Sequence, residues 1–287
     1  MSNYDIAREI KPIKYETLKP LYLELIRNQH SLKPLCIKFN KISDFFTFEE
    51  RLNTTGNKGI SFYEFYRDKE KHYKCIENML EFYKTKRKNK SEVCLYKYIF
   101  NLYFGSITNF SISNVMQVLK MYNPKFVLDM TCGFGNRMVA SCAFGVEKYI
   151  GIDSNEKLNI PLNELRTFLS NHSNTKIDVI IQDCLTVDYS LIYYDMVFTS
   201  LPYYNIEIYG NKKQYDNKKE WNEQFYKPII ERTYKYLQNG GIYALNVPEL
   251  IYNNVCILVL GECSEKIELY KRKRNNDYHE WIYVWRK

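Results

Sequence analysis

Residues 127–137 have the sequence Val127-Leu-Asp-Met-Thr-Cys-Gly-Phe-Gly-Asn-Arg137, and the rest of the chain can be placed around them. An apolar run that ends in Asp129 and continues into Gly133-x-Gly135 predicts a strand, a tight turn and the start of a helix. A turn without Cβ atoms lets a ligand approach the backbone amides. The third glycine of a dinucleotide site is absent, and the acid precedes the glycines, which argues against a nicotinamide cofactor.

Two more apolar runs end in an acid. Residues 148–153 end in Asp153, about 20 residues after the first acid, where a carboxylate can accept both hydroxyls of a ribose. Residues 178–184 end in Asp183 and Cys184. Each acid taken singly is also a good N-cap for a following helix. Their repetition predicts a parallel α/β sheet whose strand ends meet at a ligand crevice.

A fourth apolar run leads into a polar turn, Phe198-Thr-Ser-Leu-Pro-Tyr-Tyr204. The hydroxyl of Ser200 and the carbonyl of Leu201 can accept the two hydrogens of an exocyclic amino group. An aromatic ring, that of Tyr203, can stack on the face of the base that carries this group. The turn therefore predicts a site for a planar, amino-bearing base.

The order Asp-x-x-x-Gly-x-Gly resembles the first motif of class I AdoMet-dependent methyltransferases. The segment 200–203 resembles the Ser-Pro-Pro-Tyr motif of the amino-group DNA methyltransferases, with Leu201 where that family usually has its first proline. The resemblance covers about residues 107–287. It implies a Rossmann-like α/β fold with a seven-stranded, mostly parallel sheet that ends in an antiparallel hairpin, which we expect at residues 266–270 and 280–285 around a turn at 275–277.

The resemblance also implies S-adenosyl-L-methionine as the cofactor and gives site residues. Asp153 would bind the ribose and Asp183 the adenine amino group, with Cys184 beside the ring. The remaining cofactor neighbours would be Asp129, Thr131, Gly133 and Gly135 in the first motif, and Phe110 and Ser111 at the start of the preceding helix. The catalytic turn would be Ser200, Leu201, Pro202 and Tyr203. Direct transfer from the sulfonium to the amino nitrogen requires neither a cysteine nucleophile nor a metal.

Charge is concentrated in the first third of the chain. Residues 1–105 hold 20 Lys and Arg against 13 Asp and Glu, a net charge of +7 out of +8 for the 287 residues. This region has helical spacing of apolar residues and no strand alternation, so we predict a helical, basic N-terminal region (1–105) attached to a catalytic domain (106–287). Basic side chains gain affinity for nucleic acid by displacing counterions from phosphates. Candidate nucleic-acid contacts are Lys86, Arg87, Lys88 and Tyr204.

Bland alternatives exist for these features. The basic run 84–90 also fits a solvated linker between two helices, and Phe62, Phe65 and Tyr66 fit a small core as well as a base-stacking surface. Residues 205–219 are polar and predict a lid over the substrate. The helix expected at 220–238 contains Pro228, which predicts a kink or a split.

The eight cysteines are scattered without a Cys-x-x-Cys pair, and no apolar stretch is long enough to span a bilayer. We therefore expect reduced thiols, a cytoplasmic location, no metal site and no membrane partner. The predicted activity is methylation of an exocyclic amino nitrogen in DNA, of cytosine or adenine, with RNA as a second nucleic-acid partner. Alternatives are methylation of guanine in RNA or of a protein glutamine, and a binding subunit that keeps the fold without catalysis.

Overall fold

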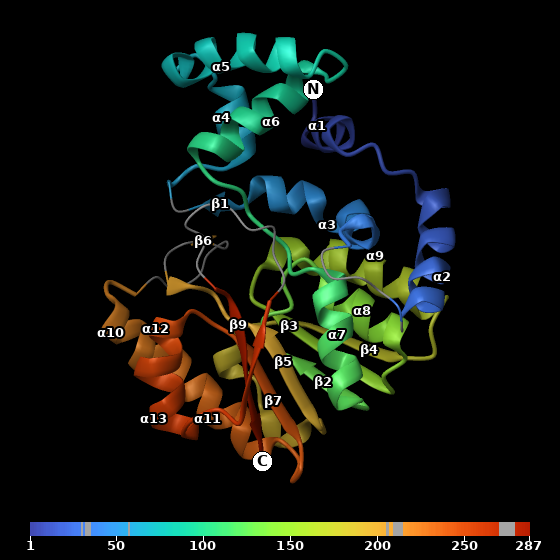
Figure 1. Cartoon of the computed structure of the whole chain (residues 1–287), viewed down its shortest axis with the longest axis vertical. Helices are drawn as coiled ribbons and strands as arrows, with labels where there is room; N and C mark the ends of the chain where they lie inside the picture. The colour runs from blue at the N-terminus through green and yellow to red at the C-terminus, as the bar shows by residue number, and fades with distance from the viewer. Residues whose placement is uncertain (30, 32–35, 57, 205–206, 209–214, 270–278) are drawn as a thin grey trace.

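The computed structural model describes residues 1–29, 31, 36–56, 58–204, 207–208, 215–269 and 279–287. Within these residues a seven-stranded sheet has the order β4-β3-β2-β5-β7-β9-β8 (Figure 1). Its strands are β2 (Phe126–Asp129), β3 (Lys148–Asp153), β4 (Lys176–Ile181), β5 (Met196–Ser200), β7 (Ile242–Asn246), β8 (Glu265–Glu268) and β9 (Trp281–Arg286). The first five are parallel, and β9 runs antiparallel to both of its neighbours. The predicted sheet and closing pair are confirmed, while the predicted turn at 275–277 lies outside the described residues.

Helices cover both faces of this sheet. One face packs against α7 (Ile112–Tyr122), α8 (Asn136–Phe144) and α9 (Asn159–Ser170). The other packs against α10 (Lys218–Trp221), α11 (Lys227–Tyr236), α12 (Glu249–Ile251) and α13 (Ile257–Leu260). Successive strand residues alternate between the two cores, as Val127 and Leu128 do. Burial on both faces explains why these strands have continuous apolar sequences instead of alternating ones. None of the described helices is long and apolar enough to cross a membrane.

The helix expected at 220–238 has no break, but its α-helical geometry changes part of the way along. A π-helical segment, Asn222–Tyr226, joins α10 to α11, and Pro228 lies in the first turn of α11. A proline is tolerated there because its missing N–H falls where the α-helical hydrogen-bond ladder restarts. The predicted effect of Pro228 thus takes the form of a π-helical turn on its N-terminal side.

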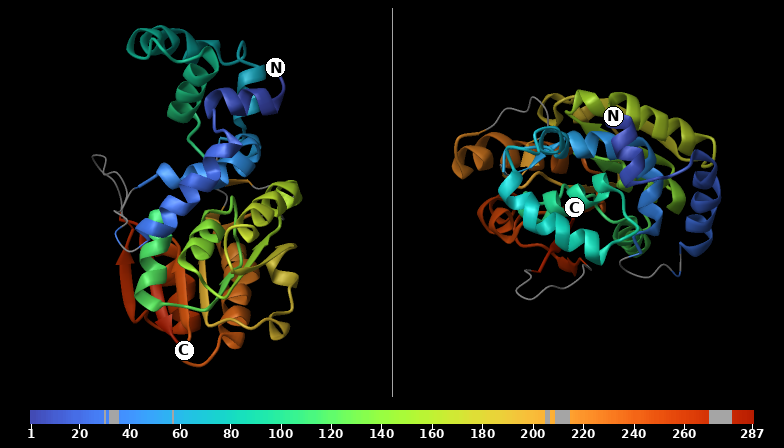
Figure 2. Two further views of the ribbon diagram at one scale, coloured as in Figure 1. Left: turned by 90° about the vertical axis from the view of Figure 1, so that its right-hand side faces the viewer. Right: turned by 90° about the horizontal axis from the view of Figure 1, so that it is seen from above.

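The N-terminal region is helical, as predicted, and its helices divide between two cores. They are α1 (Asn3–Ile10), α2 (Leu18–Asn28), α3 (Lys41–Asn53), α4 (Phe62–Arg67), α5 (Tyr73–Lys86) and α6 (Glu92–Tyr103). Apolar residues of α2, with Ile42 of α3, join the core beneath α7 and α8. Phe62 and Phe65 join a separate core with α1 and α6, while Tyr66 packs against it. The small-core interpretation of these aromatics is therefore confirmed. Helices α1, α4, α5 and α6 form an upper lobe, and α3 lies between this lobe and the sheet domain (Figures 1 and 2).

A two-residue ladder connects the N-terminal region to the polar segment after the catalytic turn. Strand β1 (Thr55–Gly56) pairs antiparallel with β6 (Glu207–Ile208). This strand has no counterpart in the sequence pattern of residues 1–105, because two residues are too few to show alternation. Most of the segment predicted as a lid, residues 205–206 and 209–214, lies outside the described residues.

Both ends of α8 carry a glycine in the left-handed conformation, Gly135 at φ 82° and Gly145 at φ 90°. A Cβ atom on Gly135 would lie 2.5 Å from Cδ2 of the buried Leu165, whereas a Cβ on Gly145 meets nothing within 4 Å. We expect Gly135→Ala to lower the free energy of unfolding by about 2 to 4 kcal/mol, from backbone strain plus overpacking. The matched variant Gly145→Ala should cost only about 1 kcal/mol of strain. Urea unfolding of both variants measures this difference, and equal costs would contradict the close packing of α8 against α9.

Candidate cofactor and substrate site

Asp129, the last residue of β2, is completely buried, and its carboxylate accepts hydrogen bonds from three side chains. Its Oδ2 accepts from Arg137 Nε at 2.7 Å and from the Tyr149 hydroxyl at 2.6 Å, and its Oδ1 accepts from the Thr199 hydroxyl at 2.9 Å. One carboxylate thus joins β2 to α8, β3 and β5. The prediction that Asp129 contacts the cofactor needs correction, because it does not line the cleft described below and its oxygens face inward. Its influence on the Gly turn acts through Arg137.

Asp153, the last residue of β3, braces the Gly turn and still faces the cleft. Its Oδ2 accepts from the backbone amide of Gly133 and its Oδ1 from that of Asn155, both at 2.9 Å. Gly133 has φ 56°, so this turn favours glycine. A carboxylate oxygen has two lone-pair directions, so each oxygen keeps acceptor capacity for a ribose hydroxyl.

A cleft of about 360 Å³ opens at the carboxyl ends of β2, β3 and β4. Its polar wall includes Thr131, Asp153 and Asp183, with Cys184 buried behind them. Its lining also includes three aromatic residues, Tyr215, Trp221 and Phe225. This volume lies within the range of about 300 to 1,000 Å³ that is usual for small-molecule sites. Trp221 and Phe225 belong to the helix expected at 220–238, and nothing in their spacing distinguishes a ligand wall from a core.

Asp183 combines two of the roles expected from the sequence. Its side chain accepts from the amide of Leu185 at 2.9 Å and so caps a short 3-10 turn. The residue is exposed and lines the cleft. The capping role is therefore observed, and it leaves lone pairs available to a ligand amino group.

Asn246, at the end of β7, holds the two polar side chains of the catalytic turn. Its Oδ1 accepts from the hydroxyls of Ser200 at 2.9 Å and Tyr203 at 2.6 Å. Its Nδ2 donates to the carbonyl of Trp281 at 2.9 Å, which fixes the orientation of the amide. Asn246 was not predicted as a site residue, because its neighbour in the sheet, Ser200, is 46 positions away in the sequence.

Tyr226 also fixes the turn at residues 200–203 through two hydrogen bonds. The hydroxyl of Tyr226 donates to the carbonyl of Pro202 at 2.7 Å and accepts from the amide of Tyr204 at 2.8 Å. Leu201 is 1% exposed, so its side chain anchors the turn in the apolar core. Tyr204 has φ 52°, and its ring packs edge-on against Trp221 and Tyr226. The prediction of Tyr204 as a nucleic-acid contact conflicts with this burial, because its ring belongs to the core.

A hydrogen bond joins the segment after β2 to the turn at residues 200–203. The hydroxyl of Thr131 donates to the carbonyl of Ser200 at 2.9 Å and lies 2.7 Å from the hydroxyl of Thr199. Phe110 and Ser111 lie beside the start of α8, where the carbonyl of Phe110 accepts from Asn136 Nδ2 at 2.6 Å. The Ser111 hydroxyl pairs with that of Ser113 at 2.8 Å instead of capping α7. Neither Phe110 nor Ser111 lines the cleft.

Helix α3 of the N-terminal region supports the Gly turn. This contact was not predicted from the sequence. Ser43 donates to the side-chain oxygen of Asn136, and the Thr47 hydroxyl donates to the carbonyl of Phe134 at 3.1 Å. Farther along, Asn155 Nδ2 donates to Glu50 Oε1 at 3.1 Å. The Gly turn and the loop after β3 are thus both fixed by the same helix.

Lys86, Arg87 and Lys88 lie at the end of α5 and in the turn that leads to α6. All three are exposed, and Arg87 lies 4.3 Å from the ring centre of Tyr98. They form a link between two helices, as the linker alternative describes, and they remain available to phosphates. No described group of three or more His, Cys, Asp and Glu side chains could hold a metal ion. Burial, together with the carboxylates of Asp153 and Asp129, raises the pKa of the Cys132 thiol well above its ordinary value, so this thiol is not a nucleophile at neutral pH.

The strand order and the antiparallel closing pair define the class I methyltransferase fold, which is Rossmann-like. No protein-family model and no curated protein matches the chain. Solved structures match it, including an rRNA methylase from Streptococcus thermophilus at 16% identity over 61% of this chain and 93% of that one, with a TM-score of 0.41. TrmN from Thermus thermophilus is 16% identical over 61% and 48%, with a TM-score of 0.41. TehB from Haemophilus influenzae is 17% identical over 66% and 66%, with a TM-score of 0.38. Similarity at this level concerns the fold alone.

Removing the Asp129 carboxylate should leave Arg137 as a buried charge without its partner. We expect Asp129→Ala to lower the free energy of unfolding by about 3 to 5 kcal/mol. The double variant Asp129→Ala with Arg137→Met should recover part of this loss, since it removes the stranded charge as well. Chemical unfolding of the single and double variants measures the coupling. Strictly additive costs would mean that the pair contributes no interaction.

Proposed function

We propose that the protein is an AdoMet-dependent methyltransferase that methylates an exocyclic amino nitrogen of a nucleic-acid base, with cytosine or adenine in DNA as its substrate. The observation that carries this proposal is the hydrogen bond from Thr131 to the carbonyl of Ser200. It joins Thr131, a wall residue of the cleft, to the first residue of the Ser-Leu-Pro-Tyr turn. A cofactor in the cleft and a base held by this turn would meet at the carboxyl ends of β2 and β5.

The cleft has groups suited to each part of S-adenosyl-L-methionine, which when bound supplies a methyl group on a positive sulfur. Asp153 offers acceptors to the ribose and Asp183 to the adenine amino group. Cys184, Trp221 and Phe225, which also line the cleft, would contact the adenine ring. Thr131, Gly133 and Gly135, with Phe110 and Ser111 beside them, would surround the methionine part.

Asn246 explains how Ser200 could act as an acceptor. Because the Ser200 hydroxyl donates its only hydrogen to Asn246, the oxygen lone pairs are left for another donor. The two hydrogens of a base amino group would bond to this oxygen and to the carbonyl of Leu201. That arrangement favours a pyramidal nitrogen with its lone pair aimed at the methyl group. The nitrogen forms a bond to the methyl carbon as the carbon–sulfur bond breaks, and it then releases one proton to water.

Two alternative activities rest on other features. A turn of this kind could also bind the amino group of guanine in RNA or of a protein glutamine, and the basic upper lobe suits RNA as well as DNA. A binding subunit without catalysis would account for Leu201 in place of proline. The hydrogen bonds that orient Ser200 and Tyr203 favour the catalytic interpretation, since a binding subunit has no need of them.

The role of Asp183 in cofactor binding can be separated from its role as a cap. Asp188 caps the next 3-10 turn through Ser190 and does not line the cleft. We expect Asp183→Ala to weaken AdoMet binding by about 1 to 3 kcal/mol, because a charge-assisted hydrogen bond is lost. Asp188→Ala should leave the affinity unchanged. Titration calorimetry measures both, and equal affinities in the two variants would remove the adenine assignment of Asp183.

The activity itself is tested with labelled AdoMet and separate DNA, RNA and protein pools, followed by mass spectrometry of the methylated product. We expect N-methylated cytosine or adenine from the DNA pool. Ser200→Ala should lower kcat by about 10-fold to 100-fold without changing AdoMet affinity, since one acceptor for the amino group is lost. Ser190→Ala is the control, and Leu201→Pro should preserve or raise the rate.

Other products would change the assignment in defined ways. Label in RNA guanine or in protein glutamine would replace the DNA substrate with that alternative. Absence of transfer to every pool, in wild type and in Leu201→Pro, despite measurable AdoMet binding, would leave the binding subunit in place of the enzyme.

A further inference from the structure

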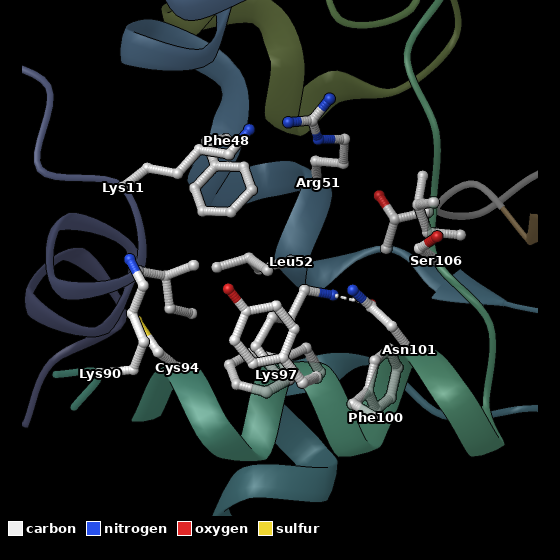
Figure 3. Close-up of a pocket in the computed structure, with 15 residues that line it drawn as sticks. Lys11, Phe48, Arg51, Leu52, Lys90, Cys94, Lys97, Phe100, Asn101 and Ser106 are labelled. Carbon is white, nitrogen blue, oxygen red and sulfur yellow. Dashed lines mark hydrogen bonds between the residues drawn. The ribbon is translucent and has the colours of Figure 1, made fainter. Parts of the chain in front are cut away.

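A second cavity, of about 330 Å³, lies in the upper lobe (Figure 3). Its walls come from the end of α1, from α3, α4 and α6, and from the segment that leads to α7. The apolar part of the wall consists of Phe48, Leu52, Phe62 and Phe100. The polar part contains four basic residues, namely Lys11, Arg51, Lys90 and Lys97. None of them belongs to the cofactor cleft.

Positive charge inside this cavity exceeds negative charge. The buried carboxylate of Asp44 pairs with both Lys11 and Arg51. Lys97 donates to the side-chain oxygen of Asn101 at 2.8 Å, and among the described residues no carboxylate forms an ion pair with it. Three inner cations therefore share one carboxylate, and Lys90 adds a fourth cation at the exposed rim. Lys97 is half-buried and forms no ion pair among the described residues, so the positive charge that faces the cavity exceeds what the Asp44 carboxylate balances, and this excess suits an anion.

The state of Lys97 fits the same conclusion. Burial, and then the charges of Arg51 and Lys11, lower the pKa of Lys97 to about 7. Its ammonium group lies 4.7 Å from the ring centre of Phe100 and 5.1 Å from that of Phe62. An entering anion would supply the missing negative charge and favour the protonated amine.

We propose that this cavity binds one nucleotide of the nucleic-acid substrate, with the phosphate among Lys11, Arg51 and Lys97 and the sugar or base against the phenylalanine wall. This assignment rests on the proposed function and names a substrate-anchoring site for it. A volume near the lower end of the usual range of about 300 to 1,000 Å³ suits one nucleotide better than a longer segment. The same chemistry would accept a free mononucleotide, which the experiment separates from a chain.

The place of the cavity suits an anchor for the strand that reaches the catalytic turn. Arg51 lies in the cavity wall and also 5.8 Å from the ring centre of Phe134 in the Gly turn. Thr54, another wall residue, immediately precedes β1, whose partner β6 follows the catalytic turn. Lys90 ends the exposed basic run that contains Lys86, Arg87 and Lys88, so a phosphate chain could continue along that run.

Binding is measured by calorimetry without AdoMet, with three probes: a dinucleoside monophosphate, a nucleoside 5′-monophosphate and inorganic phosphate. We expect the dinucleoside monophosphate to bind, Lys97→Met to weaken its affinity about tenfold or more, and Lys97→Arg to retain it. The control Lys125→Met removes an exposed charge just before β2, outside the cavity and the basic run 84–90, and should have no effect. Without a ligand, Lys97→Met should be about as heat-stable as wild type, because Lys97 is half-buried and forms no ion pair among the described residues.

The pH dependence gives an independent readout. The diester probe does not titrate between about pH 6 and pH 9, so changes in its affinity report the protein. Lys97 is charged below its pKa of about 7 and loses its charge above it, so wild-type affinity should fall as the pH rises through this value. Lys97→Arg should not show this fall, because a guanidinium stays charged. The other titratable groups of the cavity wall are Lys11, Arg51, Lys90, Cys94 and Tyr98, with Asp44 paired to Lys11 and Arg51, and none of them is exchanged in this comparison.

Several results would overturn the proposal. Unchanged affinity in Lys97→Met would remove the site, and binding of the 5′-monophosphate alone would make the ligand a free nucleotide instead of a chain. Equal binding of inorganic phosphate would reduce it to a phosphate site. If Lys97→Met does not fold, Lys90→Met at the exposed rim tests the same cavity, and unchanged affinity there would count against it. None of these outcomes depends on AdoMet binding or methyl transfer, so the failure of this site and the failure of the proposed enzyme are distinguishable.

Discussion

The buried carboxylate of Asp129 is the interaction on which the rest of the site depends. It receives hydrogen bonds from three different elements of the fold, and one of its donors is a guanidinium that would otherwise be a charge without a partner. In a medium of low dielectric constant such a pair holds its geometry closely, because every displacement leaves a polar group unsatisfied. The Gly turn, the end of β5 and the start of α8 are therefore fixed relative to one another before any ligand arrives.

A second set of contacts extends this rigidity to the N-terminal region. Helix α3 bonds to the Gly turn through Ser43 and Thr47, and its opposite side forms a wall of the basic cavity. The helix thus belongs to both parts of the protein. A division of the chain at residue 105 describes the sequence well but crosses this packing, since α2 and α3 bury apolar side chains in the core of the sheet domain.

The sequence predicted the sheet correctly because β2, β3, β5 and β7 are mainly apolar runs that end in a polar residue, and such runs are local patterns. It also brought Asp153, Asp183 and Ser200 to one edge of the sheet, since the carboxyl ends of parallel strands share that edge. Asn246, the aromatic lining of the cleft and the support from α3 escaped prediction. Each of these depends on contacts between distant segments, and a single sequence carries no record of which segments meet. Asp129 and Tyr204 were assigned to ligands because motif position does not reveal which way a side chain faces.

The π-helical segment Asn222–Tyr226 has a consequence for how this site could change over time. A π turn contains one residue more than an α turn, so it shifts the phase of all preceding residues by about 100°. With this extra residue, Trp221 and Phe225 line the cleft while Tyr226 reaches back to the carbonyl of Pro202. A deletion of one residue here would restore a regular helix. Trp221 would then be rotated relative to Tyr226, so one helix could no longer place both side chains as it does now. Insertions or deletions in this segment should therefore disturb the site much more than substitutions do, even though the segment is helical.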